Sequence, residues 1–386
     1  MTKYLKFALL ILASGCRLFA FSQEENLSIL NRSRLWYSHS DNKSHCHDTA
    51  VARRLSLDLL SNSYIKNNEY FGAYTEGITY FGSVLQPELK YDVTNQVSLS
   101  AGWHFNYFFG QEKLNRSLPV IRVVYRPTKK INILIGQLYG KTDHCLIEPI
   151  YSNDNYYAKH PEYGIQLRTG GKIKTDTWID WEKFILPGDP EQEQIGAGTH
   201  IFSNFKINNT LHLSAHFQAV VHHFGGQVDA SDNYLQTRAN LAPGLELSFH
   251  AETSDLNIIG KAYFVQALDL SQTPQLPYLK GYGTYFTLTG LYKGFFAVAG
   301  YWNSEYYFAP MASTLFQSIS DLNNWYYEDN RQLFLGKFGY NKSLTSNIKM
   351  GIRFETYYDL VKRRNDFSYG MNIQLNPQIF LKNIKQ

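Results

Sequence analysis

The chain has 386 residues with 37 basic and 33 acidic side chains, and it is rich in aromatic residues, with 29 Tyr and 25 Phe. Much of the excess of basic over acidic side chains lies in residues 1–22, so the rest of the chain is close to neutral and gives no argument for binding nucleic acid. No later stretch approaches eighteen uninterrupted apolar residues, which excludes a transmembrane helix there.

Residues 1–22 have the layout of a secretory signal peptide. A basic start at Lys3 precedes an apolar stretch, and Ala20-Phe21-Ser22 offers a cleavage site of small residues. A weak lipoprotein box that ends at Cys16 is the alternative, and it would place a lipid on that cysteine. In either case we expect the chain to be exported.

Strict alternation of apolar and polar side chains is the main structural signal. In TLHLSAHFQAVVHHF (210–224), one face carries Leu, Ala, Phe and Val, and the other is rich in histidine. Segments 97–107 and 348–359 alternate in the same way, and about sixteen such segments follow one another along the chain. A period of two predicts β-strands that are apolar on one face and polar on the other.

The links between these strands alternate between short and long. Short turns are predicted near 94–96, 129–130, 171–175, 208–209, 254–255, 293–294 and 345–346, and long links at 66–78, 111–117, 141–161, 186–194, 225–235, 271–280, 310–330 and 361–366. Short periplasmic turns, long outer loops and an even strand number are typical of transmembrane β-barrels. The sequence therefore predicts an all-β, transmembrane, antiparallel up-and-down barrel of about sixteen strands.

Membrane physics explains the two faces of each strand. In hydrocarbon every backbone polar group must pair internally, so a closed barrel is one of only two spanning solutions. We expect the apolar faces to meet lipid, the polar faces to meet the lumen, and the aromatic residues at strand ends to form interfacial girdles.

On this architecture the chain resembles bacterial outer-membrane β-barrels of the porin-like kind, over about residues 55–381. The resemblance implies location in the bacterial outer membrane, contact with outer-membrane lipid and with the barrel assembly machinery, and a third outer loop, 141–161, that folds inward. Residues 23–54 are then a periplasmic segment or a small plug of the lumen, and 55–386 are the barrel. The chain departs from such barrels at its end, where LKNIKQ follows the aromatic Phe380.

The charged and histidine side chains on the predicted inner faces suggest a channel for passive passage of small polar or charged solutes. Opposed rings of charge set ion selectivity in a pore, and we expect the acids of the third outer loop to oppose the arginines of the strands beside it. The constriction-loop candidates are Asp143, Glu148 and Asp154. The pore-lining candidates are Arg122, Arg126, Arg168, Asp180, Glu182, His212, His216, His222, Glu246, His250, Arg353 and Glu355.

Two cysteines remain after removal of residues 1–22. Cys46 and Cys145 could form a disulfide, because an even pair in an exported chain favours one. Two free thiols are the first alternative. A soft metal site is the second, built from His45, Cys46, His47, His144 and Cys145. We expect no resident metal and no cofactor.

Enzymatic activity is not expected from the sequence. Ser214 and Ser248 lie near His216 and His250, but residues two apart on one strand are simply successive inward positions, and no nucleophile-elbow motif is present. The pair Asp180 and Glu182 could serve glycoside chemistry but suits a solvated lumen equally well.

A binding protein is the alternative to the channel. In this interpretation a plugged, non-enzymatic barrel holds a surface polysaccharide through its outer loops. The segment Trp325-Tyr326-Tyr327, within 310–330, offers aromatic faces that stack on sugars.

Overall fold

The computed structural model describes residues 52–226, 228–252, 254–323 and 326–384. Within them the chain forms a closed antiparallel barrel of sixteen strands, as predicted, and a short seventeenth segment continues the last of these strands. The strands are β1 (Arg54–Glu69), β2 (Thr79–Asp92), β3 (Val97–Phe108), β4 (Arg116–Thr128), β5 (Ile131–Gln137), β6 (Tyr163–Thr169), β7 (Ile173–Lys183), β8 (Gln194–Lys206), β9 (Leu211–Phe224), β10 (Gln236–His250), β11 (Asn257–Asp269), β12 (Lys280–Tyr292), β13 (Phe295–Glu305), β14 (Asn330–Ser343), β15 (Ile348–Asp359), β16 (Arg364–Leu375) and β17 (Gln378–Asn383).

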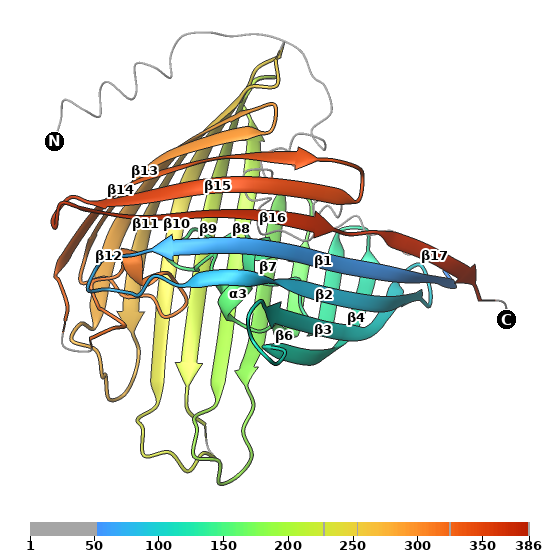
Figure 1. Cartoon of the computed structure of the whole chain (residues 1–386), viewed down its shortest axis with the longest axis horizontal. Helices are drawn as coiled ribbons and strands as arrows, with labels where there is room; N and C mark the ends of the chain where they lie inside the picture. Colours follow the sequence, from blue (N-terminus) through green and yellow to red (C-terminus); the bar gives the residue numbers. More distant parts are fainter. Residues whose placement is uncertain (1–51, 227, 253, 324–325, 385–386) are drawn as a thin grey trace.

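Closure occurs at β1. One edge of β1 pairs with β2, and the other edge pairs first with β17, at residues 54–58, and then with β16, at residues 61–69. β17 therefore continues β16 after a break at Pro377, and Figure 1 shows it running beside the start of β1 towards the C-terminus. Because both edges of β1 are paired, the barrel has no open seam between its first and last strands.

The two faces of the wall have opposite polarity. On β10, Leu245 and Leu247 point outward and are 55% and 42% exposed, whereas Glu246 and Ser248 point inward and are 5% and 1% exposed. Most other strands alternate in the same sense, whereas every residue of β17 is exposed. An apolar exterior suits hydrocarbon, and a polar interior is typical of transmembrane barrels. Among the described residues no helix is long and apolar enough to span a bilayer.

Links at one end of the barrel are two to six residues long, from the two-residue turn 293–294 to 251–256, and most links at the other end are longer. The prediction of a long link at 361–366 is wrong. Residues 360–363 form a tight connection, because Arg364–Asp366 already pair with Tyr357–Asp359 and extend β16.

Two of the longest links fold into the barrel and together form what we call the lumen plug. Link 138–162 contains the 3-10 turn η1 (Lys141–His144) and the short helix α3 (Asn155–Ala158), and link 306–329 contains η2 (Thr314–Phe316). The links bind each other directly, because the Ser152 N–H donates to the Met311 carbonyl at 2.8 Å and the Tyr307 hydroxyl to the Pro149 carbonyl at 2.6 Å.

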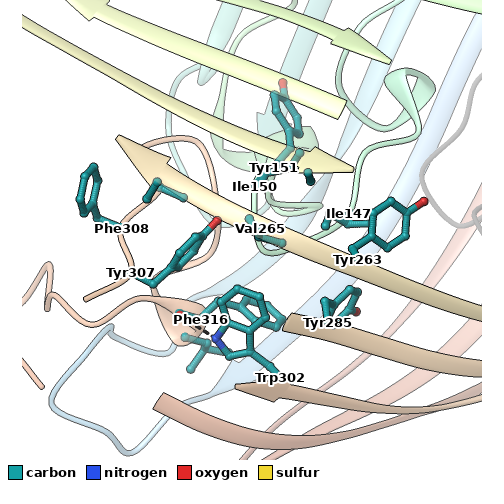
Figure 2. Close-up of a cluster of buried hydrophobic side chains, with 14 of the residues drawn as sticks. Ile147, Ile150, Tyr151, Tyr263, Val265, Tyr285, Trp302, Tyr307, Phe308 and Phe316 are labelled. Carbon is teal, nitrogen blue, oxygen red and sulfur yellow. Dashed lines mark hydrogen bonds between the residues drawn. The ribbon is translucent and has the colours of Figure 1, made fainter. Parts of the chain in front are cut away.

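The lumen plug has a hydrophobic core of its own (Figure 2). Ile147, Ile150 and Tyr151 from the first link meet Tyr307 and Phe316 from the second, and all are buried against inward side chains of β11–β14. Trp302 of β13 is fully buried in this cluster and donates its indole N–H to the Phe316 carbonyl at 2.9 Å. This part of the interior is therefore packed like a soluble protein core, and a water-filled lumen lined only by polar groups would lack such a cluster.

Candidate functional site

The structure places the pore-lining candidates on the inward faces of β4, β6, β7, β9, β10 and β15, where they are buried or half-buried around the lumen plug. We expected the acids of the third outer loop to face arginines on the neighbouring strands. Glu148 and Asp154 instead have their partners on the opposite side of the barrel. Arg122 instead forms an ion pair with Glu88 on β2 at 3.0 Å.

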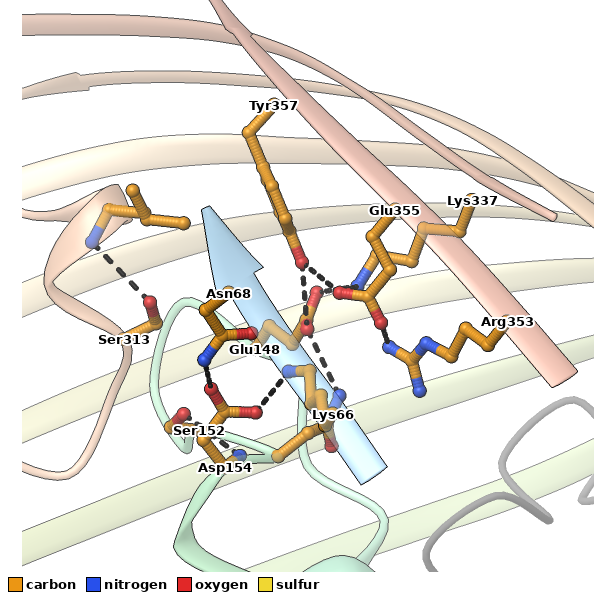
Figure 3. A network of polar contacts seen from close by, with 12 residues as sticks. Lys66, Asn68, Glu148, Ser152, Asp154, Ser313, Lys337, Arg353, Glu355 and Tyr357 are labelled. Atoms are coloured by element: carbon orange, nitrogen blue, oxygen red, sulfur yellow. Dashed lines mark hydrogen bonds and ion pairs between the residues drawn. The ribbon is translucent and has the colours of Figure 1, made fainter. Parts of the chain in front are cut away.

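Lysines on the far wall hold the first link in place (Figure 3). Lys337 of β14 pairs with Glu148, and Lys66 of β1 pairs with Asp154. Asn68 adds a hydrogen bond to the second oxygen of Asp154 at 2.9 Å. Burial by itself would raise the pKa of Glu148, but the positive charges of Lys337, Arg353 and Lys66 together outweigh burial and lower that pKa below its usual range. Glu148 therefore stays ionised and anchors the plug to the wall.

His144 anchors the same link to the near wall. Its Nε2 lies 2.7 Å from Glu162 Oε2 and its Nδ1 lies 3.1 Å from Asp176 Oδ2, and the ring stacks on Trp178 with centroids 3.5 Å apart. Burial would lower the pKa of His144, but the two carboxylates outweigh burial and raise that pKa to about 10. His144 is thus a buried imidazolium with both nitrogens donating. It cannot act as a general base at neutral pH. From the sequence, His144 was a candidate only for binding a metal ion.

A second buried histidine, His222, lies near the barrel end that carries the long links and has one carboxylate beside it. His222 Nε2 lies 3.3 Å from Glu182 Oε1, and Lys159 Nζ lies 3.0 Å from the other oxygen of Glu182. The His222 side chain is 5% exposed, and neither of its ring nitrogens forms a hydrogen bond with any of the described residues. We call His222 and Glu182 the outer-end dyad. The sequence predicted that both side chains face inward, but it did not predict that they lie next to each other.

Gly196 makes the outer-end dyad possible. β8 lies between β7 and β9, and Gly196 pairs with His222 on one side and Asp180 on the other. A Cβ at position 196 would lie 2.9 Å from Glu182 Oε1, so the missing side chain leaves the space through which Glu182 reaches across β8. The dyad has the elements of a general base, because it places an imidazole beside a carboxylate.

The Ser–His combinations considered from the sequence do not form a nucleophile. Ser214 lies opposite Glu246 in the register and donates to Asn204 at 2.8 Å. Ser248 lies opposite His212. His216 contacts another histidine, with its Nδ1 3.0 Å from His200 Nε2.

Several sequence-based interpretations fall outside the described residues. Cys46, and with it the disulfide to Cys145, is among them, as are two histidines of the proposed soft metal site and Trp325 of the outer loop. Cys145 itself is half-buried and follows η1 in a left-handed conformation, with φ of 58°. In the part of the chain that the structure describes, His, Cys, Asp and Glu form no cluster of three that could hold a metal ion.

The chain is similar in fold to several solved outer-membrane proteins. The outer-membrane protein OprD of Pseudomonas aeruginosa is 10% identical, with a TM-score of 0.50 over 87% of this chain and 98% of that chain. OccAB2 of Acinetobacter baumannii is 11% identical, with a TM-score of 0.48 over 86% of this chain and all of that chain. OmpT of Vibrio cholerae, with loop L8 deleted, is 12% identical, with a TM-score of 0.49 over 83% and 98%. No curated protein sequence matches this chain. At these identities the likeness concerns the fold, and the chain is an outer-membrane β-barrel.

A family model described as "Lipid A 3'-O-deacylase-type" matches residues 45–384. The description names an enzymatic activity, so the prediction that the chain is not an enzyme is wrong. That prediction relied on the absence of a nucleophile-elbow motif in the sequence. Because the match spans most of the chain, the protein belongs to the lipid A 3'-O-deacylase-type family.

Proposed function

We propose that this protein is an outer-membrane hydrolase that removes an ester-linked acyl chain from lipid A. Its membership of the lipid A 3'-O-deacylase-type family is the observation that carries the reaction class. Location in the outer membrane puts the barrel beside such a substrate. The outer-end dyad supplies a base near the barrel end that carries the long links, which is the outer end in barrels of this kind.

In the proposed reaction a water molecule attacks the ester carbonyl. His222 Nδ1 takes a proton from this water, and Glu182 stabilises the imidazolium that forms. In this proposal Lys159, whose Nζ lies 3.0 Å from Glu182, stabilises the negative charge that develops on the carbonyl oxygen. The bond between the acyl carbon and the sugar oxygen then breaks, and His222 returns the proton to that oxygen. The products are a free fatty acid and a lipid A hydroxyl group.

Mass spectrometry of lipid A tests the proposal. Purified, folded protein incubated with lipid A in mixed micelles is expected to yield a product lighter by one acyl chain, together with the matching fatty acid. Unchanged lipid A, in the presence of protein shown to be folded by circular dichroism, would contradict the proposed function.

The channel remains a separate prediction from the sequence, and the lumen plug bears on it. A packed core between two inward links leaves little room for a wide aqueous path. We expect the purified protein to show no steady conductance in planar bilayers. The double variant Glu148→Gln and Asp154→Asn removes both charged anchors of the first link and should produce intermittent conductance. Steady, ion-selective conductance of the unmodified protein would favour the channel instead.

A further inference from the structure

The lipid-facing wall carries a groove that the proposed reaction does not use. It spans β12 to β16 and has a volume of about 780 Å³. Its lining includes outward-facing apolar side chains such as Phe295 and Phe338, which are 60% and 59% exposed. Most outward positions on the wall carry large side chains, so a hollow of this size needs a local cause.

Two small residues create the hollow. Gly290 of β12 and Ala297 of β13 pair with each other, and Phe338 follows in the same register row on β14. No atom lies within 4 Å of where a Gly290 Cβ would stand. Tyr292 and Phe295 form the next outward-facing pair towards the turn 293–294, and they line the end of the groove nearest that turn.

The groove lies near the barrel end with short turns, and basic residues stand at that end of it. Tyr292 and Phe295 flank the two-residue turn 293–294, so this part of the groove faces the periplasmic leaflet. Lys293 in the turn is exposed, and its Nζ lies 5.3 Å from the centre of the Tyr292 ring. Lys342, also exposed, lies two residues beyond the groove-lining Tyr340 on β14.

We propose that this groove binds one acyl chain of an anionic phospholipid from the periplasmic leaflet, with the lipid phosphate held by Lys293 and Lys342. The apolar lining continues the lipid-facing surface of the barrel, and the two ammonium groups complement a phosphate at the membrane–water interface. The bound phospholipid is a structural ligand at the opposite leaflet from the outer-end dyad, and its binding does not depend on deacylase activity.

Native mass spectrometry of the full chain, released from vesicles of phosphatidylglycerol and phosphatidylcholine, tests the inference. The unmodified protein should retain one phosphatidylglycerol. Gly290→Leu should lose it, because the leucine fills the hollow without meeting a neighbour. Gly260→Leu is the matched control, since a Cβ at Gly260 on β11 would meet no atom closer than 4.0 Å and Gly260 lies outside the groove. If Gly260→Leu retains phosphatidylglycerol and Gly290→Leu does not, the result supports lipid binding in the groove. Equal retention by both variants overturns the proposal.

The lysines are tested by the preference between the two lipids. Each of Lys293→Ala and Lys342→Ala should weaken the preference for phosphatidylglycerol by about five-fold. A photoactivatable phosphatidylglycerol with a reactive group in its acyl chain should label β12–β15. Dimers that vanish in Gly290→Leu would show that a second copy of the chain covers the groove and would contradict the proposal. Preferential labelling of these strands by a lipid A probe would contradict it as well.

Discussion

Replacing His222 with Gln is expected to slow the release of fatty acid from lipid A by about 10²–10⁴-fold, the usual contribution of a general base. Glutamine keeps the side chain polar and of similar length, so the barrel should still fold, but it cannot take a proton from water. In the proposed mechanism the loss falls on kcat, because His222 acts on the attacking water and binds no other part of the substrate.

The neighbouring residue provides the control. His223 lies on the other face of β9 and hydrogen-bonds Thr237 at 2.8 Å, so His223→Gln changes the same residue type one position away and should leave the rate unchanged. Gly196→Ala should slow the reaction as well, because its Cβ would push against the Glu182 carboxylate. Equal rates for His222→Gln and the unmodified protein would remove the outer-end dyad from the mechanism, even if lipid A is deacylated.

Replacing His144 with Gln should lower the free energy of unfolding by about 3–5 kcal/mol, the cost of breaking a buried charge pair from one side. The substitution leaves Glu162 and Asp176 buried without the cation between them. Urea unfolding in detergent micelles, followed by circular dichroism, measures this difference. The loss should leave link 138–162 less firmly attached to β6 and β7.

The contribution of His144 should also depend on pH. The pKa of His144 is raised in the folded barrel to about 10, from 6.5 in an unfolded chain. Its stabilising effect is therefore complete below about pH 6.5 and disappears as the pH rises through about 10. The stability difference between the unmodified protein and His144→Gln should shrink over that range, while His223→Gln should show no such trend. A difference that stays constant from pH 6 to pH 10 would mean that His144 is not held as a cation.

The barrel could be predicted from the sequence because its signals are local. A strand such as β10 shows its two faces in any few consecutive residues, and turns such as 293–294 are short in the sequence itself. The final connection, 360–363, was predicted too long because Arg364 and Asp366 read as loop residues. The register with β15 shows that they belong to β16.

The lumen plug was less predictable. Link 141–161 was predicted to fold inward through the resemblance to porins, but the folding of 306–329 beside it was not predicted. Irregular links have no periodicity, and their packing depends on distant partners such as Tyr307 and Pro149. The inward aromatic Trp302 was one available signal, since a large apolar side chain on the lumen face requires something to pack against.

The sequence identified residues of the candidate site but not the contacts between them. His222 and Glu182 were both assigned to the lumen face, yet their contact depends on Gly196 of the intervening strand. His144 was considered only for metal binding, because its carboxylate partners Glu162 and Asp176 come together only when link 138–162 folds back onto β6 and β7. Contacts that depend on such long-range approach leave no sequence motif, and for that reason the outer-end dyad could not be predicted.

Hydrolysis of lipid A in water enriched with oxygen-18 tests the central claim most directly. If the protein is an esterase that uses water as its nucleophile, lipid A loses one acyl chain and the released fatty acid carries one heavy oxygen in its carboxyl group. Lipid A that keeps all its acyl chains, under conditions where the barrel is intact, would show that the protein does not catalyse this reaction.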